Sequence, residues 1–261
     1  MHSEALHVEI CEPIATLRLN RPAVRNALNE VLIADLSAAI RAVSEQPHVR
    51  IIVLTAQGDT FCAGADLDWM ARMAQHDQAE NLADARALAD MLHQFDQCPK
   101  PIIARVQGDA YGGGIGLISV CDIALALETA NFALSEVKLG LVPATISPYV
   151  MRAIGARQMR RYALSAEKFC ATTAQRIGLI HEVCTTENFE RAFESLIAAL
   201  LHASPQAIAS TKQLITQVSD HPINPLLREL TASAIAQART SEDGREGVAA
   251  FLEKCKPRWQ K

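Results

Sequence analysis

The sequence predicts an α/β core followed by an all-helical region. Two observations carry this prediction. In the first part of the chain, short apolar runs typical of buried strands alternate with segments whose apolar residues recur at helical spacing. From Ile146 onward the strand signals nearly disappear, apart from a short apolar piece at 180–184, and the helical pattern continues to the end. Alternating elements followed by helices indicate an α/β domain with a helical appendage.

The first elements are a strand pair and a helix. Residues 6–19 alternate between apolar and polar on either side of Glu12-Pro13, which predicts two adjacent strands ended by Asn20-Arg21-Pro22. Asn29 then provides an N-cap for a helix over about residues 30–45. Its apolar residues recur at helical spacing: Leu32, Leu36, Ile40 and Val43.

The middle of the chain repeats the alternation. The continuous apolar run 51–54 predicts a buried parallel strand, which Gln57-Gly58-Asp59 ends. A helix is expected over 79–97 and a strand over 101–106. A glycine-rich turn, an apolar helix and a strand at about 122–127 complete the predicted core.

Composition and charge exclude several classes of protein. The 261 residues suit one domain of generous size, and a formal net charge of -4 without a long basic run argues against nucleic acid binding. The seven cysteines are scattered and odd in number, which argues against a disulfide framework and a metal site and favours a cytoplasmic location. The N-terminal residues lack a signal-peptide pattern, and the longest apolar stretch, 115–127, is too short to span a membrane.

Three consecutive glycines, 112–114, stand between a predicted strand and a predicted helix. A dinucleotide-binding loop is disfavoured because Leu117 occupies the place of the third glycine, and no Gly-Lys-Ser/Thr follows to form a phosphate loop. Two interpretations remain: close packing of the helix on the strand, or an oxyanion hole in which a backbone N–H stabilises a thioester enolate. The glycines alone do not choose between them.

A second set of motifs decides the question, because it resembles the enoyl-CoA hydratase/isomerase (crotonase) superfamily in register over nearly the whole chain. The segments 61–67 and 135–143 carry the resemblance together with the triple glycine. Three further segments agree with it: Leu19-Asn20-Arg21-Pro22 with Asn26-Ala27-Leu28, Ala174 to Ile180, and Gly247 to Lys254.

The resemblance implies a fold and an assembly. It implies a crotonase-type spiral of β-β-α units over residues 1–195, which carries the coenzyme A site. It also implies a helical trimerisation region over 196–261, with homotrimers or dimers of trimers. Coenzyme A would be part of the thioester substrate, so neither a cofactor nor a metal is expected, and neither nucleic acid nor a membrane is expected as a partner.

The resemblance also assigns roles to residues. The backbone N–H groups of Ala65 and Gly113 would hold the thioester oxygen, and Glu136 would move a proton at C2. Other residues are expected to bind coenzyme A, although Arg25 and Lys254 are also compatible with solvated surface positions. The residues of this set are Arg25, Ala27, Ala63, Asp66, Leu67, Asp68, Phe251 and Lys254.

One departure from the family pattern bears on the reaction. Typical hydratases of this family have a second acid in the pattern G-G-G-x-E, but this chain has Gly116 at that position and only Glu136 twenty positions later. A single carboxylate is similar to the family's Δ3-Δ2 enoyl-CoA isomerases. A fold that binds acyl-CoA without catalysis is a further alternative.

The segment 135–150 points back toward hydration. It resembles a bacterial subgroup of methylglutaconyl-CoA and related carboxylated isoprenyl-CoA hydratases, in which Gly-x-Gly at positions 114–116 is usual. We therefore expect a hydratase acting on a branched or carboxylated 2-enoyl-CoA such as 3-methylglutaconyl-CoA. The group that activates water stays open among Asp66, Asp68, Asp109, Tyr111 and Tyr149, and an arginine for the distal carboxylate among Arg72, Arg86 and Arg152.

Overall fold

The computed structural model describes residues 4–219 and 221–260, which fall into two compact units. The first unit comprises the chain up to Cys98 together with Ile102–Phe193. The second comprises Pro99–Pro101 and the chain from Glu194 onward. The expected ranges 1–195 and 196–261 include positions 1–3, 220 and 261, which lie outside the described residues.

The first unit contains two sheets. The larger sheet has the order β1-β2-β3-β5-β7-β10, in which β1 and β2 are antiparallel and all later neighbours are parallel. Its strands are β1 (Leu6–Cys11), β2 (Ile14–Leu19), β3 (Ile51–Ala56), β5 (Ile102–Val106), β7 (Ile123–Leu127) and β10 (Glu182–Cys184). The smaller sheet has the order β4-β6-β8-β9, made of β4 (Thr60–Cys62), β6 (Asp109–Tyr111), β8 (Asn131–Ala133) and β9 (Phe169–Cys170).

The two sheets are built together by a repeated unit. In each of three successive turns of the chain, one strand enters the larger sheet and the next strand enters the smaller one, as β3–β4, β5–β6 and β7–β8. Helical segments follow each pair, so the expected spiral of β-β-α units is confirmed. The ends of the smaller sheet's strands therefore lead directly into the segments that carry the candidate site.

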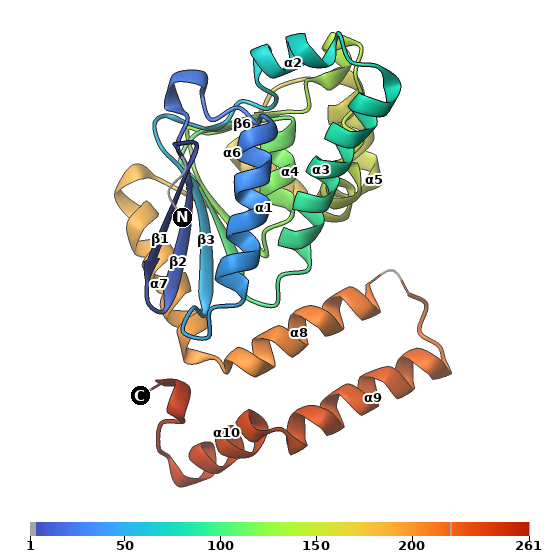
Figure 1. Ribbon diagram of the computed structural model, residues 1–261. Helices are drawn as coiled ribbons and strands as arrows, with labels where there is room; N and C mark the ends of the chain where they lie inside the picture. Colours follow the sequence, from blue (N-terminus) through green and yellow to red (C-terminus); the bar gives the residue numbers. More distant parts are fainter. Residues whose placement is uncertain (1–3, 220, 261) are drawn as a thin grey trace. The chain divides into compact units, whose positions relative to one another are not determined.

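Helices follow the strands. They are α1 (Glu30–Ser44), α2 (Leu67–Met73), α3 (Gln78–Asp96), α4 (Gly113–Ser119), α5 (Ser147–Ser165), α6 (Ala171–Ile177) and α7 (Thr186–His202), with short 3-10 turns η1 (Pro22–Val24) and η2 (Glu136–Leu139). The expected cap is confirmed, because the Asn29 side chain accepts a hydrogen bond from the Leu32 N–H at 2.9 Å. Helix α1 packs beside α3, and in Figure 1 it stands to the right of β3.

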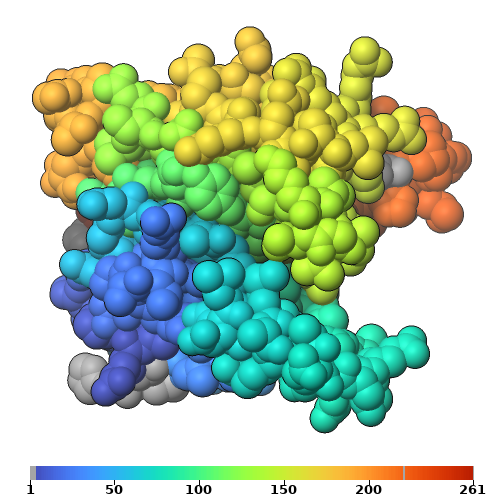
Figure 2. Space-filling view, turned by 90° about the horizontal axis from the view of Figure 1, so that it is seen from above, coloured from blue at the N-terminus to red at the C-terminus, as the bar shows by residue number. Residues whose placement is uncertain are grey.

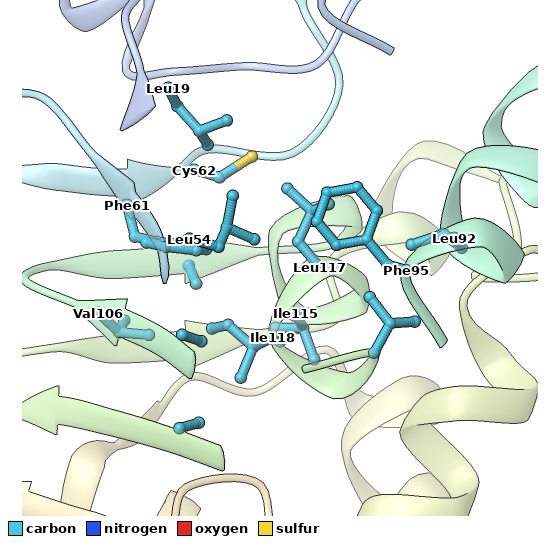
Figure 3. Close-up of a cluster of buried hydrophobic side chains, with 14 of the residues drawn as sticks. Leu19, Leu54, Phe61, Cys62, Leu92, Phe95, Val106, Ile115, Leu117 and Ile118 are labelled. Carbon is cyan, nitrogen blue, oxygen red and sulfur yellow. The ribbon is translucent and has the colours of Figure 1, made fainter. Parts of the chain in front are cut away.

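The core of the first unit is mainly aliphatic. Each residue of β3 is buried, as the continuous apolar run predicted for a parallel strand. Leu117 of α4 lies beside Phe95 and Leu92 of α3 (Figure 3), and all three are fully buried. This packing fixes α4, the helix that begins at the triple glycine, against α3.

The second unit is helical. Its helices are α8 (Pro205–Val218), α9 (Pro225–Thr240) and α10 (Glu242–Glu253), followed by η3 (Arg258–Gln260), and α7 runs across the boundary between the units. Side chains of Ser204, Asn224 and Ser241 cap the three helices. The expected helical C-terminal region is confirmed.

Four short strands were not expected from the sequence. They are β4, β6, β8 and β9, and none is longer than three residues. Three residues show at most one alternation of apolar and polar side chains, so such a strand has no detectable period. The pairing of β4 with β6, and of β6 with β8, defines these strands.

Candidate active site

The loop that follows β4 is joined to the N-terminal segment by a backbone pairing. Leu28 donates from its N–H to the Gly64 carbonyl at 2.7 Å and accepts from the Asp66 N–H at 2.8 Å, so that Leu28 and Ala65 lie opposite each other. On the face seen in Figure 2, the blue N-terminal segment lies next to the cyan segment around β4. Ala65 is therefore held by residues far upstream in the chain.

Asn26 and Arg21 brace this pairing. Asn26 is fully buried, and its side-chain amide donates to the carbonyls of Gln57 and Thr60, both at 2.8 Å, while its oxygen accepts from the Arg21 N–H. Arg21 in turn donates to the Asp66 carboxylate at 2.8 Å. The N-terminal motif thus fixes both ends of the loop that contains Ala65.

The turn before α4 requires glycine at position 112. Gly112 has φ +47, and a Cβ there would lie 2.9 Å from Oε1 of Glu136. The same Cβ would lie 3.9 Å from the Cα of Gly64, and a Cβ on Gly64 would lie 3.2 Å from the Tyr111 carbonyl oxygen. The two glycines therefore let the Ala65 loop, the start of α4 and Glu136 meet.

Two backbone N–H groups at this junction are available to a ligand. Gly113 is the first residue of α4, where an N–H has no acceptor within the helix. In the described part of the chain, neither the Gly113 N–H nor the Ala65 N–H donates to another residue. Each follows one of the two packed glycines. This arrangement suits a pair of donors for a developing oxyanion.

Glu136 lies at the start of η2 with its carboxyl group half-buried beside Gly112. Its Oε2 atom is buried, and no residue of 4–219 or 221–260 donates a hydrogen bond to it. Burial raises the pKa of this carboxyl above its usual value, and only a hydrogen bond to its own backbone opposes the shift. A buried carboxyl with a raised pKa and an unpaired oxygen is suited to proton transfer.

Position 116, one helical turn after Gly112, is closed to any side chain. A Cβ on Gly116 would lie 2.3 Å from Cγ2 of Ile146 and 3.8 Å from Cδ2 of Leu92. Ile146 is 2% exposed, so the methyl group that fills this space is itself packed in the core. The structure thus places hydrocarbon where the family's second acid would begin.

The residues predicted to bind coenzyme A fall into two groups in the first unit. Arg25, Leu67 and Asp68 are exposed, and Ala63 is half-buried, near the Ala65 loop. Asp66 and Ala27 are buried and hold the loop itself: Asp66 caps α2, and the Ala27 carbonyl accepts from Arg21. The Asp66 carboxylate is thereby engaged within the protein.

The electrostatics of Asp66 agree with a structural role for its side chain. Burial alone would raise its pKa, but hydrogen bonds from Arg21 and from the N–H groups of Trp69 and Asp68 outweigh burial and lower it. Asp66 is therefore a fixed anion at the start of α2.

Phe251 and Lys254 belong to the helical unit. Phe251 is 83% exposed, and Lys254 ends α10 in the left-handed conformation. Their contact with coenzyme A stays a prediction.

Most of the other polar candidates already have partners within the protein. Asp109 accepts from Asn131, Lys168 and the Tyr111 hydroxyl, which holds its pKa below the usual value although burial opposes this. Arg72 pairs with Glu30 at 2.5 Å, and Arg152 pairs with Asp96 and lies over the Tyr149 ring. Arg86 is exposed.

Sequence reasoning missed the roles of several residues that shape the site. Gly64 and Gly112 were noticed as parts of motifs, but their contact joins segments that are distant in the chain. Asn26 lies between Arg25 and Ala27 in the N-terminal motif, and nothing in the sequence indicated that its side chain is fully buried. Nothing in the sequence indicated that Ile146 meets Gly116.

No group of three or more His, Cys, Asp or Glu side chains in the described residues could hold a metal ion. Among the helices that the structure describes, none is long and apolar enough to cross a membrane.

The fold brings two backbone N–H groups without acceptors and one half-buried carboxyl group together at a single junction. The family model described as Enoyl-CoA hydratase/isomerase matches residues 9–261. The chain belongs to this family, and it is an enzyme of the hydratase type that acts on an acyl-CoA.

Individual relatives agree with this assignment. An enoyl-CoA hydratase structure from Shewanella pealeana is 43% identical, with a TM-score of 0.95 and coverage of 98% of this chain and 96% of that one. Pseudomonas aeruginosa AtuE is 35% identical, with a TM-score of 0.94 and coverage of 99% and 100%. The 2,3-dehydroadipyl-CoA hydratase of Escherichia coli is 35% identical over 247 residues, which cover 94% of each chain.

Proposed function

We propose that this enzyme adds water to a branched or carboxylated 2-enoyl-CoA, such as 3-methylglutaconyl-CoA, with Glu136 as its catalytic carboxylate. The observation that carries the proposal is the half-buried Glu136 carboxyl beside Gly112, whose buried Oε2 has no donor among the described residues, at the junction where the Ala65 and Gly113 N–H groups have no acceptor. The segment 135–150 supports the substrate class. So does the relative whose name specifies a 2,3-dehydroadipyl group, since adipyl is a dicarboxylic acyl chain.

One carboxylate is sufficient for a balanced reaction. The Glu136 carboxylate accepts a proton from water as the water oxygen forms a bond to C3, and the C2–C3 double bond shifts its electrons toward the thioester oxygen. The N–H groups of Ala65 and Gly113 stabilise that oxygen, and losing one such donor typically costs about 3 kcal/mol of transition-state stabilisation. Neutral Glu136 then returns the proton to C2, which leaves a 3-hydroxyacyl-CoA and restores the carboxylate.

A second function is favoured by one observation. Ile146 rather than a second acid lies beside Gly116, and a lone carboxylate is sufficient to carry a proton between C4 and C2. A Δ3-Δ2 enoyl-CoA isomerase is therefore the alternative activity. A non-catalytic acyl-CoA binder is the remaining alternative, against which the unpaired Glu136 oxygen argues.

The proposal extends to assembly and location. We expect homotrimers or dimers of trimers formed through the helical unit, where Leu226, Phe251 and Leu252 expose 81%, 83% and 73% of their surface. We also expect a cytoplasmic location, since all seven cysteines are free thiols.

The test compares three substrates: 3-methylglutaconyl-CoA, crotonyl-CoA and 3-hexenoyl-CoA. Loss of enoyl absorbance and product mass are followed for the wild type, for Glu136→Gln, and for Glu45→Gln as a control at an exposed glutamate. We expect a gain of one water on a 2-enoyl substrate, lost by at least a hundredfold in Glu136→Gln and kept in the control. Conversion of 3-hexenoyl-CoA without a mass change, and no hydration, would establish the isomerase instead.

A binding measurement with coenzyme A thioesters distinguishes the non-catalytic acyl-CoA binder from the two enzymes. If Glu136→Gln and the wild type bind equally well and neither converts any of the three substrates, the chain is a binder for these thioesters and the proposed hydration is wrong.

A further inference from the structure

A polar network of four residues joins neighbouring strands of the smaller sheet, with the Asp109 carboxylate at its centre. One carboxylate oxygen accepts from the Asn131 N–H at 2.8 Å and from the Asn131 side-chain amide at 3.1 Å. The other oxygen accepts from the Tyr111 hydroxyl and from the Lys168 ammonium group, the latter at 3.2 Å. Asp109 begins β6, Asn131 begins β8, and Lys168 directly precedes β9. The carboxylate therefore connects three strands.

Two of these strands lead into the candidate site. Strands β6 and β8 are parallel, with Tyr111 opposite Ala133, so their carboxyl ends lie at the same edge of the sheet. The chain passes from β6 directly into Gly112 and Gly113, and from β8 to Glu136 three residues after the strand ends. The distance between the Gly113 N–H and the Glu136 carboxyl thus depends on how β6 and β8 are aligned.

The strands themselves offer little backbone to fix this alignment. Each has three residues, and they pair over two residue pairs. A slip of one residue would displace one strand by about 3.3 Å along the other and turn its side chains to the opposite face. The hydrogen bond from the Asn131 N–H to the Asp109 carboxylate adds a contact at the strand starts, and the Gly112 N–H adds one at the strand ends by donating to the Ala133 carbonyl at 3.0 Å.

The charge of Asp109 suits an anchor and not a proton acceptor. Burial would raise its pKa, but hydrogen bonds from Tyr111 and Asn131, together with Lys168, outweigh burial and lower it. Hydrogen bonds to an ionised acceptor are stronger than those between neutral groups. A carboxylate with a lowered pKa and both oxygens occupied is poorly suited to accept a proton from water.

We propose that Asp109 is a positioning residue, which holds β6 and β8 in register and thereby sets the distance between the Gly113 N–H and the Glu136 carboxyl. The inference rests on the proposed function, which assigns the oxyanion and the proton to these two groups. Asp109 acts through the strands and does not touch the substrate.

The first experiment measures kcat and KM for 3-methylglutaconyl-CoA or crotonyl-CoA, whichever the wild type hydrates faster. The variants are Asp109→Ala, Asp109→Asn and Asp122→Ala. Asp122 is a matched control, because it is also half-buried, directly precedes β7, and accepts from the N–H of Ile102 on the neighbouring strand β5 at 2.7 Å. It joins strands of the larger sheet, whereas Asp109 joins strands of the smaller one.

We expect Asp109→Ala to lower kcat about ten- to a hundredfold with little change in KM, because a displacement of about 1 Å between reacting groups has an effect of this size. Asp109→Asn should recover most of kcat, since an amide can accept from the Asn131 N–H and donate to the Tyr111 hydroxyl. Asp122→Ala should lower Tm and keep kcat. An unchanged kcat in Asp109→Ala would overturn the proposal, and so would an equal loss in Asp122→Ala.

The pH profile separates position from charge. In Asp109→Ala we expect the acidic limb of kcat/KM to move to lower pH, because a displaced Glu136 carboxyl is less buried and burial is what raises its pKa. Asp109→Asn removes the same negative charge but keeps the strands aligned, so its limb should stay at the wild-type pH. An equal shift in both variants would show that Asp109 acts through its charge, which would overturn the proposal.

A double-mutant cycle tests transmission through the network. Tyr111→Phe removes only a hydroxyl group, so it remains informative if Asp109→Ala does not fold. We expect Tyr111→Phe to lower kcat in the wild type and to cause no further loss in an Asp109→Ala background, where the acceptor is already absent. An unchanged kcat in Tyr111→Phe, or equal losses in both backgrounds, would overturn the proposal.

Failure of the proposed function gives a different result. If the wild type only isomerises 3-hexenoyl-CoA, hydration is wrong, and the same variants are compared in the isomerisation, which also uses Glu136. If the wild type converts none of these thioesters, the proposed function is refuted, and the positioning role with it.

Discussion

The carboxyl group of Glu136 is only partly accessible to water. Its Oε2 atom lacks a donor among the described residues, and a buried acceptor without a partner costs about 1–3 kcal/mol. An unpaired oxygen of this kind is available to a substrate, which explains how a residue that weakens the fold is compatible with the proposed reaction.

The pH dependence of activity follows from the direction of this shift. Because burial raises the pKa of Glu136, the carboxylate that accepts the proton from water is lost at a higher pH than for an exposed glutamate. We expect kcat/KM for a 2-enoyl substrate to fall on the acidic side with an apparent pKa above 4.5. An acidic limb at or below that value would contradict the assignment.

The effect of Glu136 on the free energy of unfolding should be opposite to its effect on activity: this side chain favours the folded state most at low pH. A raised folded-state pKa means that the folded protein binds this proton more tightly than the unfolded chain, so the stabilisation is greatest at low pH and is lost as pH rises through the folded-state value. Glu136→Gln remains neutral throughout. We expect it to unfold at a higher urea concentration than the wild type at neutral pH, and the difference to shrink below about pH 4. The exposed Glu45→Gln variant serves as the control.

At the scale of elements, the loop that carries Ala65 depends on a side-chain network from the N-terminal segment. Asn26 is the centre of it, since its amide joins Arg21 to Gln57 and Thr60. The position of the Ala65 N–H therefore depends on side chains that precede it by about forty residues in the chain.

Removing this amide should affect both stability and catalysis. In Asn26→Ala, the carbonyls of Gln57 and Thr60 lose their donor, which costs about 1–3 kcal/mol, and the Ala65 loop is released at one end. Asn81→Ala is the matched control, because the Asn81 amide also bonds carbonyls, those of Met73, His76 and Asp77, at the start of α3. We expect both variants to lower Tm, but only Asn26→Ala to lower kcat. A loss of kcat of equal size in both variants would contradict the inference that Asn26 positions the Ala65 loop for catalysis.

Elements of the fold were predictable where their period was long enough. The helix beginning after Asn29 and the buried strand 51–56 carried a cap or a continuous apolar run, and both are present. The strands β4, β6 and β8 were not predictable, because their partners rather than their residues define them. Since the site lies where β4 and β6 end, its geometry depends on the elements that were hardest to anticipate.

For the whole molecule, the sequence indicated which segments carry the chemistry but not how they meet. The roles proposed for Ala65, Gly113 and Glu136 came from a resemblance, and the structure adds the contacts at Gly64 and Gly112 that join their segments. The closure of position 116 by Ile146 depends on packing between α4 and the start of α5, which no local pattern encodes.

The proposed assembly gives a prediction at this scale. Leu226 is 81% exposed on α9 of the helical unit, and a charge there is harmless in a monomer but unfavourable in a buried interface. We expect light scattering to give the mass of a trimer or hexamer for the wild type and a smaller mass for Leu226→Glu. Leu164→Glu is the control, because Leu164 is 75% exposed in the first unit. A monomeric wild type would refute the assembly.

The alkylation rate of the Cys62 thiol can be used to measure opening of the contact between β4 and the start of α4. Cys62 is fully buried beneath α4, where a Cβ on Gly114 would lie 2.8 Å from its Cβ, and burial raises its pKa to about 12. Alkylating reagents attack the thiolate, so this cysteine is protected both by coverage and by protonation while the exposed Cys11, Cys170 and Cys255 react. The rate at which Cys62 acquires a label therefore reports how often the protein opens around β4 and the start of α4.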